Sequence, residues 1–130
     1  MAHQHSPAFL ALVEDAKTRV VEVGVREVGE RLARGDAFHL IDVREDHEWA
    51  VDRARGARHL GKGILERDVE LTIPDKQAEI VLYCGGGFRS ALAADALQRM
   101  GYMRVRSLAG GIRAWREQAL PLERGDAGGG

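Results

Sequence analysis

Residues 79–100 read EIVLYCGGGFRSALAADALQRM, and this stretch passes from a strand through a glycine-rich loop into a helix. Residues 80–83 are all apolar, which is typical of a strand that is covered on both faces. Apolar side chains then recur at helical spacing through residues 92–100, and Gly101 follows at a position where helices commonly end. A strand that leads through a short loop into a helix is the building unit of a parallel sheet, so the stretch predicts an α/β fold.

The rest of the chain repeats this alternation. Further helices are expected over residues 7–20, 26–34, 45–51, 64–71 and 112–119, and further strands over residues 21–23, 38–43, 57–60 and 105–108. We therefore expect one α/β domain, with a mostly parallel central sheet and helices on both faces. This domain is expected to span residues 21–121, after an N-terminal helical extension over residues 1–20 and before a disordered glycine-rich tail over residues 122–130.

Composition and charge exclude several classes of protein. The 130 residues are 45% apolar and 30% charged, which is typical of a globular domain and not of a disordered chain. Nineteen basic side chains stand against twenty acidic ones, so the chain lacks the positive field that binds nucleic acid. No apolar run approaches the ~20 residues that cross a bilayer, and the first residues lack the pattern of a secretion signal. We therefore expect a cytoplasmic protein with neither a nucleic-acid nor a membrane partner.

Cys84 is the only cysteine of the chain. A single cysteine excludes an internal disulfide, a cysteine-rich zinc site and a Cys-x-x-Cys redox pair. The five histidines lack the spacing of metal ligands, so we expect neither a metal nor another cofactor. A lone cysteine is most often a small buried hydrophobic residue, and only the residues around Cys84 favour a chemical role.

Cys84 stands where a predicted strand ends and is followed by three glycines. Ligands of an open α/β sheet gather outside the carboxyl ends of its strands. A run of glycines can curl so that successive N–H groups form an anion-binding nest, and the next helix adds its positive end. Such a place favours a thiolate, and Arg89 adds a fixed positive charge. The alternative is an ordinary glycine-rich turn, which explains less well why a cysteine and an arginine bracket the glycines.

Three segments together resemble a single-domain rhodanese. They are IDVRE at residues 41–45, VLYCGGGFRS at residues 81–90 and LAGGIRAW at residues 108–115, and the similarity runs in one unbroken order over about residues 20–121. The resemblance implies a sulfurtransferase in which Cys84 takes sulfane sulfur from thiosulfate or a persulfide donor. The Cys84 persulfide then passes that sulfur to cyanide or to a thiol acceptor, either a small thiol or a partner protein. The residues expected to bind the substrate and the persulfide are Gly85, Gly86, Gly87, Phe88 and Arg89.

One segment departs from the family pattern. The family usually reads Gly-His-Ile where this chain has Asp52-Arg53-Ala54, whereas the Gly56-Ala57 pair that follows is retained. The departure puts the local turn geometry in doubt and leaves the cysteine loop unaffected. The extra arginines are interpreted either as positive charge near the site or as a solvated surface.

Three residues at other strand ends are candidates for supporting roles. Asp42 could orient Arg44 or the loop amides, or it could be a buried aspartate that only shapes the sheet edge. Arg44 and Lys62 could attract an anionic donor, although a charged strand end is usually just solvated.

Two other functions compete with sulfur transfer. Cysteine-dependent phosphatases and arsenate reductases also combine a thiolate, a nest and an arginine, but they place five residues between the cysteine and the arginine. Only four residues separate Cys84 from Arg89, which predicts a tighter loop suited to one sulfur atom. No aspartate lies nearby in the sequence as an acid for an alcohol leaving group. A rhodanese-like module used only for binding typically lacks the cysteine, which this chain retains.

Overall fold

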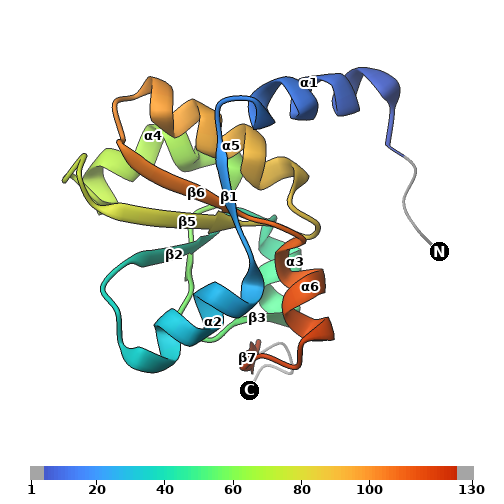
Figure 1. Cartoon of the computed structure of the whole chain (residues 1–130), viewed down its shortest axis with the longest axis vertical. Coiled ribbons are helices and arrows are strands. Elements are labelled where there is room, and N and C mark those ends of the chain that lie inside the picture. The colour runs from blue at the N-terminus through green and yellow to red at the C-terminus, as the bar shows by residue number, and fades with distance from the viewer. Residues whose placement is uncertain (1–4, 126–130) are drawn as a thin grey trace.

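Five parallel strands form the centre of the protein in a computed structural model that describes residues 5–125 (Figure 1). Their order across the sheet is β1-β6-β5-β2-β4, and every neighbouring pair runs parallel. The strands are β1 (Val21–Val23), β2 (His39–Asp42), β4 (Arg58–His59), β5 (Glu79–Tyr83) and β6 (Arg104–Leu108). Because all five run the same way, their carboxyl ends meet at one edge of the sheet, and the predicted α/β fold with a mostly parallel sheet is confirmed.

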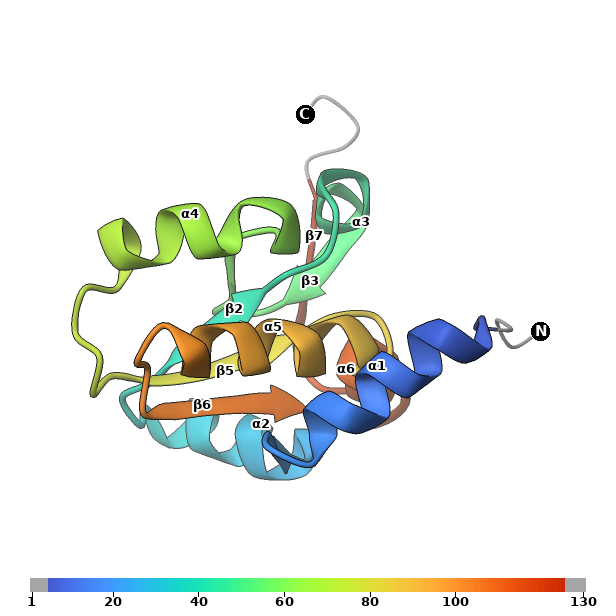
Figure 2. The same cartoon turned by 90° about the horizontal axis from the view of Figure 1, so that it is seen from above.

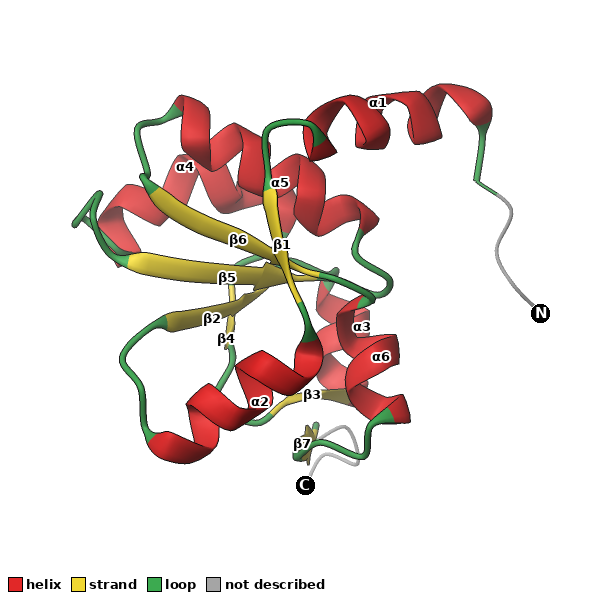
Figure 3. Cartoon of the chain, in the orientation of Figure 1, coloured by secondary structure: helices red, strands yellow, loops and turns green. Residues whose placement is uncertain are grey.

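Helices cover both faces of this sheet (Figures 2 and 3). One face packs against α4 (Lys62–Thr72) and α5 (Phe88–Arg99), and the other against α2 (Val25–Arg34) and α6 (Gly111–Glu117). Each face has its own cluster of buried apolar side chains. Within the described chain, no helix combines the length and the apolar character that crossing a bilayer requires.

Strand β5 lies in the middle of the sheet and is buried along its whole length. Its side chains alternate between the faces, as the period of a strand requires. Ile80 and Leu82 point to the α4–α5 side, whereas Val81 and Tyr83 point to the α2–α6 side. Cys84 continues the alternation after the strand ends and joins the α4–α5 cluster. The same pattern that buries the strand therefore directs the sulfur toward the start of α5.

A second, two-stranded sheet was not predicted. Strand β3 (Asp52–Ala54) pairs antiparallel with β7 (Leu122–Arg124), and Asp52 lies opposite Arg124. The expectation of a disordered tail from residue 122 is therefore wrong for residues 122–124, because their backbone groups are used in this ladder. The amide of Gly125 also donates to the carbonyl oxygen of Val51 at 2.9 Å. The remaining tail residues, 126–130, lie outside the described residues.

The first helix, α1 (Pro7–Lys17), packs along α5. Ser6 caps it by accepting a hydrogen bond from the amide of Phe9 at 3.3 Å. The helix ends three residues earlier than the predicted residue 20, because Thr18 closes it and the chain turns into β1. The short helix α3 (Asp46–Val51) follows β2 and begins with a capping box between Glu45 and Glu48.

Candidate functional site

The sulfur of Cys84 lies at the carboxyl edge of the sheet, directly after β5. Two backbone amides donate to Sγ, from Gly87 at 3.2 Å and from Ser90 at 3.3 Å. Both amides belong to the first turn of α5 or to its cap, where the helix carries partial positive charge. The loop therefore offers donors that solvate negative charge on sulfur. Of the predicted loop residues Gly85 to Arg89, Gly87 is the one whose amide donates to Sγ within residues 5–125, and the second donor, Ser90, was not among them.

Two serine hydroxyls extend the polar contacts of the Cys84 sulfur into the protein interior. The Cys84 thiol donates to Ser90 Oγ at 3.5 Å, and Ser90 Oγ lies 2.8 Å from Ser107 Oγ. All three residues are buried. Because a hydroxyl hydrogen rotates to suit its partner, Ser90 can accept from a thiol or donate to a thiolate. Ser90 ends the segment at residues 81–90 that carries the resemblance, but it was not predicted to contact the sulfur. Nothing in the sequence marks Ser107, which only the pairing of β5 with β6 brings to this place.

Gly87 gives the loop its shape. Its φ of +99° lies in the left-handed region, where only glycine is unstrained. A Cβ at this position would also lie 3.1 Å from the backbone nitrogen of Gly110. The loop can therefore pass close to the turn before α6 only because residue 87 has no side chain.

The start of α6 holds the carbonyl groups of the loop. The amide of Ile112 donates to the Cys84 oxygen at 2.9 Å, and the amide of Arg113 donates to the Gly85 oxygen at 3.1 Å. Gly111 lies against the same backbone, and a Cβ there would clash with the Cys84 oxygen and reach 2.7 Å from the Gly85 carbonyl. Two loop carbonyls are thus directed at α6, where helical N–H groups satisfy them.

Arg89 lies beside the loop, and its guanidinium forms an ion pair with Glu48. Its guanidinium donates to the two carboxylate oxygens of Glu48 at 2.8 and 3.1 Å. This bond lowers the pKa of Glu48 from its ordinary 4.5 to about 2, although burial opposes the shift. The same bond raises the pKa of Arg89, against burial and with a smaller contribution from Cys84. Glu48 was not predicted as a site residue, and only its place in the capping box signals that its side chain is fixed.

Cys84 lies at the floor of a cleft of about 650 Å³, although only 1% of its surface is exposed. This volume is in the range of small-molecule sites. The walls come from α1 and Phe88, from α3 and from α6. The lining residues outside the loop are His5, Phe9, Arg44, His47, Glu48, Val51, Asp52, Ile112, Arg113 and Arg116.

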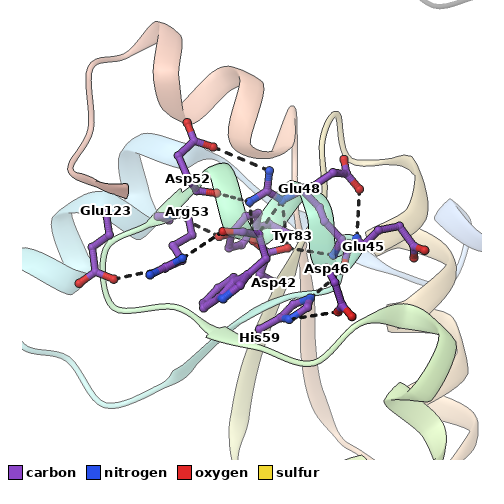
Figure 4. A network of polar contacts seen from close by, with 12 residues as sticks. Asp42, Glu45, Asp46, Glu48, Asp52, Arg53, His59, Tyr83 and Glu123 are labelled. Carbon is purple, nitrogen blue, oxygen red and sulfur yellow. Dashed lines mark hydrogen bonds and ion pairs between the residues drawn. The ribbon is translucent and has the colours of Figure 1, made fainter. Parts of the chain in front are cut away.

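Asp42 and Arg44 form a buried ion pair at the end of β2 (Figure 4). Asp42 accepts from the Arg44 amide at 2.8 Å and from its guanidinium at 2.8–3.1 Å, and neither residue is more than 2% exposed. Arg44 in turn donates to the carbonyl oxygen of Asp52 at 2.6 Å. Asp42 therefore positions Arg44, which ties the edge of the sheet to the segment after α3.

Lys62 lies elsewhere. It is the first residue of α4 and does not line the cleft around Cys84, so its predicted role in attracting an anion stays a prediction. No group of three His, Cys, Asp or Glu side chains among residues 5–125 is placed to hold a metal ion.

The departure at residues 52–54 has a local structural explanation. Asp52 binds the guanidinium of Arg116 at 2.6 and 3.1 Å, and this bond lowers the pKa of Asp52. Arg53 stacks its guanidinium over the Trp49 ring at 4.5 Å and lies 3.6 Å from Glu123 on β7. Arg53 therefore fastens β3 to its neighbours and does not line the cleft around Cys84.

Residues 25–118 match the family described as Rhodanese-like domain. "Sulfurtransferase" from Allochromatium vinosum is 32% identical over 103 residues, which are 79% of this chain and 94% of that protein. "Thiosulfate sulfurtransferase PspE" from Escherichia coli is 30% identical over 89 residues, which are 68% of this chain and 82% of that protein.

Two further similar proteins differ in how much of their own length the match covers. "Probable adenylyltransferase/sulfurtransferase MoeZ" from Mycobacterium tuberculosis is 35% identical over 96 residues, 74% of this chain, but the match spans only 24% of that protein. A solved structure from Rhodopseudomonas palustris, of unknown function and described as "Possible Tyrosine Phosphatase", has a TM-score of 0.82 at 25% identity and covers 95% of this chain and 99% of its own. The family match extends over most of the chain, and the relative from Allochromatium vinosum is covered almost completely. This chain therefore belongs to the rhodanese-like family.

Proposed function

We propose that this chain is a sulfurtransferase that moves sulfane sulfur from thiosulfate or a persulfide donor to cyanide or a thiol acceptor through a persulfide on Cys84. The observation that carries the proposal is the pair of amide donors from Gly87 and Ser90 on the Cys84 sulfur. Two relatives whose names include sulfurtransferase, each covered over most of its length, support the same reaction class.

The reaction needs two displacements at sulfur. In the first, the Cys84 thiolate attacks the outer sulfur of thiosulfate, the S–S bond of thiosulfate breaks, and sulfite leaves with the electron pair. In the second, the acceptor attacks the outer sulfur of the Cys84 persulfide, and the Cys84 thiolate leaves. The amides of Gly87 and Ser90 stabilise the negative sulfur at the start and the end of each cycle.

Phosphate-ester hydrolysis is the competing activity, because the structurally similar Rhodopseudomonas palustris protein is described as a possible tyrosine phosphatase. Cleavage of an ester requires a carboxylic acid that protonates the leaving alcohol. Two carboxyl groups line the cleft, Glu48 and Asp52, and an arginine holds the pKa of each below its ordinary value. Both are therefore ionised near neutral pH. The loop also has only four residues between Cys84 and Arg89, so the site favours sulfur over phosphate.

Intact-mass spectrometry tests the proposal directly. We expect the protein to gain the mass of one sulfur atom on incubation with thiosulfate and to lose it on treatment with cyanide. Cys84→Ser, which keeps the size of the side chain but holds its proton too tightly, should gain nothing. Sulfur uptake by Cys84→Ser, or turnover of an aryl phosphate by the native protein, would contradict the proposal. Absence of uptake by the native protein would favour a binding module instead.

A further inference from the structure

A second groove, of about 640 Å³, lies between α2, α6 and the turn that follows β3, and is called the α2–α6 groove below. The helices α2 and α6 pack against each other at this place (Figure 3). The groove shares no lining residue with the cleft around Cys84. Its walls are largely apolar, and the residues that form them are Gly29, Leu32, Ala33, Trp115, Leu120 and Pro121. A concave and mainly apolar surface of this size is typical of small-molecule sites.

Hydrogen bonds within the protein fix the shape of the α2–α6 groove. Trp115, which is 1% exposed, forms the floor, and its indole N–H donates to the carbonyl oxygen of Pro121 at 2.8 Å. The same oxygen accepts from the amide of Arg55 at 3.0 Å. Ala119 turns the chain back after α6 with a φ of +55°, in the left-handed region that is unfavourable for alanine. Backbone strain of this kind persists where the surrounding structure fixes it, and it is concentrated at functional sites.

Two arginines at the rim of the groove have no partner for their charge. The guanidiniums of Arg26 on α2 and of Arg55 after β3 are exposed, and neither makes a hydrogen bond or an ion pair with a residue in the range 5–125. The other two arginines of α2 both bind Asp36. One acidic side chain, Glu30, also lines the groove. Because the two arginines outnumber the single glutamate, the rim keeps a net positive charge.

From these features we infer that the α2–α6 groove binds a small apolar carboxylic acid in its ionised form, with the carboxylate at Arg26 and Arg55 and the apolar part over Trp115. Guanidinium groups pair with carboxylates through two parallel N–H donors, and the pairing is stronger beside an apolar surface than in open water. Glu30 at the same rim repels a second negative charge, so the groove favours a monocarboxylate over a dicarboxylate. This binding is separate from sulfur transfer and involves no covalent step.

Amide NMR spectra of the full chain test the inference with phenylbutyrate as the probe. Phenylbutanol keeps the apolar part without the charge, and butyrate keeps the charge without the ring. We expect phenylbutyrate to shift the amide signals of Gly29 and Gly56 and the indole N–H signal of Trp115, and to bind about 5- to 30-fold more tightly than either comparison compound. The indole signal of Trp49 serves as an internal control, because Trp49 does not line the groove.

Matched arginine variants locate the carboxylate. Arg26→Gln and Arg55→Gln should each weaken the binding of phenylbutyrate by about 3- to 10-fold and leave the binding of phenylbutanol within about twofold. Arg58→Gln is the control, because Arg58 on β4 is also exposed but does not line the groove. Phenylbutyrate binding that neither Arg26→Gln nor Arg55→Gln weakens would overturn the inference, and so would signals that shift only in the Cys84 loop.

The same spectra separate this inference from other occupants and from the proposed function. Groove signals that move with protein concentration alone would mean that a second copy of this chain occupies the groove, which would overturn the inference. Cys84→Ser should bind phenylbutyrate as the native protein does, because the groove and the cleft have no residue in common. Failure of sulfur uptake therefore leaves the groove assignment standing. Absence of phenylbutyrate shifts at the groove overturns that assignment and leaves the proposed function standing.

Discussion

Glu48 fixes the orientation of the Arg89 guanidinium beside the Cys84 loop, because it binds two nitrogens of Arg89 at 2.8 and 3.1 Å. Both partners are partly buried, so water screens the pair less than it screens an exposed ion pair. A carboxylate with a pKa of about 2 in the folded protein, against an ordinary 4.5, stabilises the fold while it is ionised. That contribution is fully present above about pH 4.5 and is lost as the pH falls toward 2.

Glu48→Gln should therefore destabilise the protein in a pH-dependent way. The amide keeps one acceptor for Arg89 but removes the charge, so we expect a loss of about 1–2 kcal/mol in the free energy of unfolding at pH 6. The difference from the native protein should shrink steadily between pH 4.5 and 2. Urea unfolding across this range measures it. Glu123→Gln, at a more exposed ion pair with Arg53, should show a much smaller effect, and an equal effect would argue against the Glu48 assignment.

Asp42 is the acceptor at the centre of the network at the end of β2 (Figure 4). Asp42→Asn leaves the Arg44 charge buried without its partner, and we expect a loss of about 3 kcal/mol in the free energy of unfolding. Chemical denaturation measures this loss. Asp36→Asn, at less buried ion pairs with Arg31 and Arg34, should change the denaturation midpoint far less. Equal costs at the two positions would mean that the buried pair does not stabilise the β2 edge.

The loop before α5 depends on one glycine, and the chain offers a matched comparison. Gly87 and Gly101 both have a φ of +99°, but a Cβ on Gly87 meets the Gly110 backbone at 3.1 Å, whereas nothing lies within 4 Å of a Cβ on Gly101. Alanine at either position should cost about 1–2 kcal/mol of stability through left-handed strain. Only Gly87→Ala should also displace an amide from the Cys84 sulfur, lowering the rate of sulfur uptake by about 10- to 100-fold. The rate of sulfur uptake is measured by quenching the reaction at several times and determining the intact mass. Equal rates for Gly87→Ala and Gly101→Ala would refute the role of Gly87.

The elements that sequence reasoning missed are those that only tertiary pairing creates. Strands β2 and β5 were expected because their apolar runs indicate burial on both faces, whereas β1, β4 and β6 were expected as short segments that end close to glycines. Strands β3 and β7 have three residues each and are largely polar, so neither shows a readable period, and each exists because the other lies beside it. The residues of the candidate site also fall into those that are adjacent in the sequence and those that only the tertiary structure brings together. Cys84 and its glycines are adjacent in the chain, whereas Glu48 and Ser107 reach them from α3 and β6.

The two ends of β5 lie at opposite edges of the sheet, and the proposed chemistry belongs to only one of them. The carboxyl end of β5 leads into Cys84, while Glu79 begins the same strand at the opposite edge of the sheet. Glu79 is 8% exposed and binds Arg31 of α2 at 2.6 and 2.7 Å, with Arg104 of β6 at 3.4 Å. This cluster joins a helix to two neighbouring strands far from the cleft, so its contribution should be to the fold alone.

Glu79→Gln tests that separation. The variant removes the charge to which Arg31 is bound, and we expect a loss of about 1–3 kcal/mol in the free energy of unfolding at pH 7. Because the hydrogen bond from Arg31 lowers the pKa of Glu79 below its ordinary 4.5, the loss should diminish as the pH falls below that value. Sulfur uptake per folded molecule, measured by intact mass at a temperature well below unfolding, should equal that of the native protein. Glu79 lies at the amino end of β5, and no contact of its side chain reaches the Cys84 loop in residues 5–125. Reduced uptake in a fully folded variant would show that the two edges of the sheet are coupled through β5.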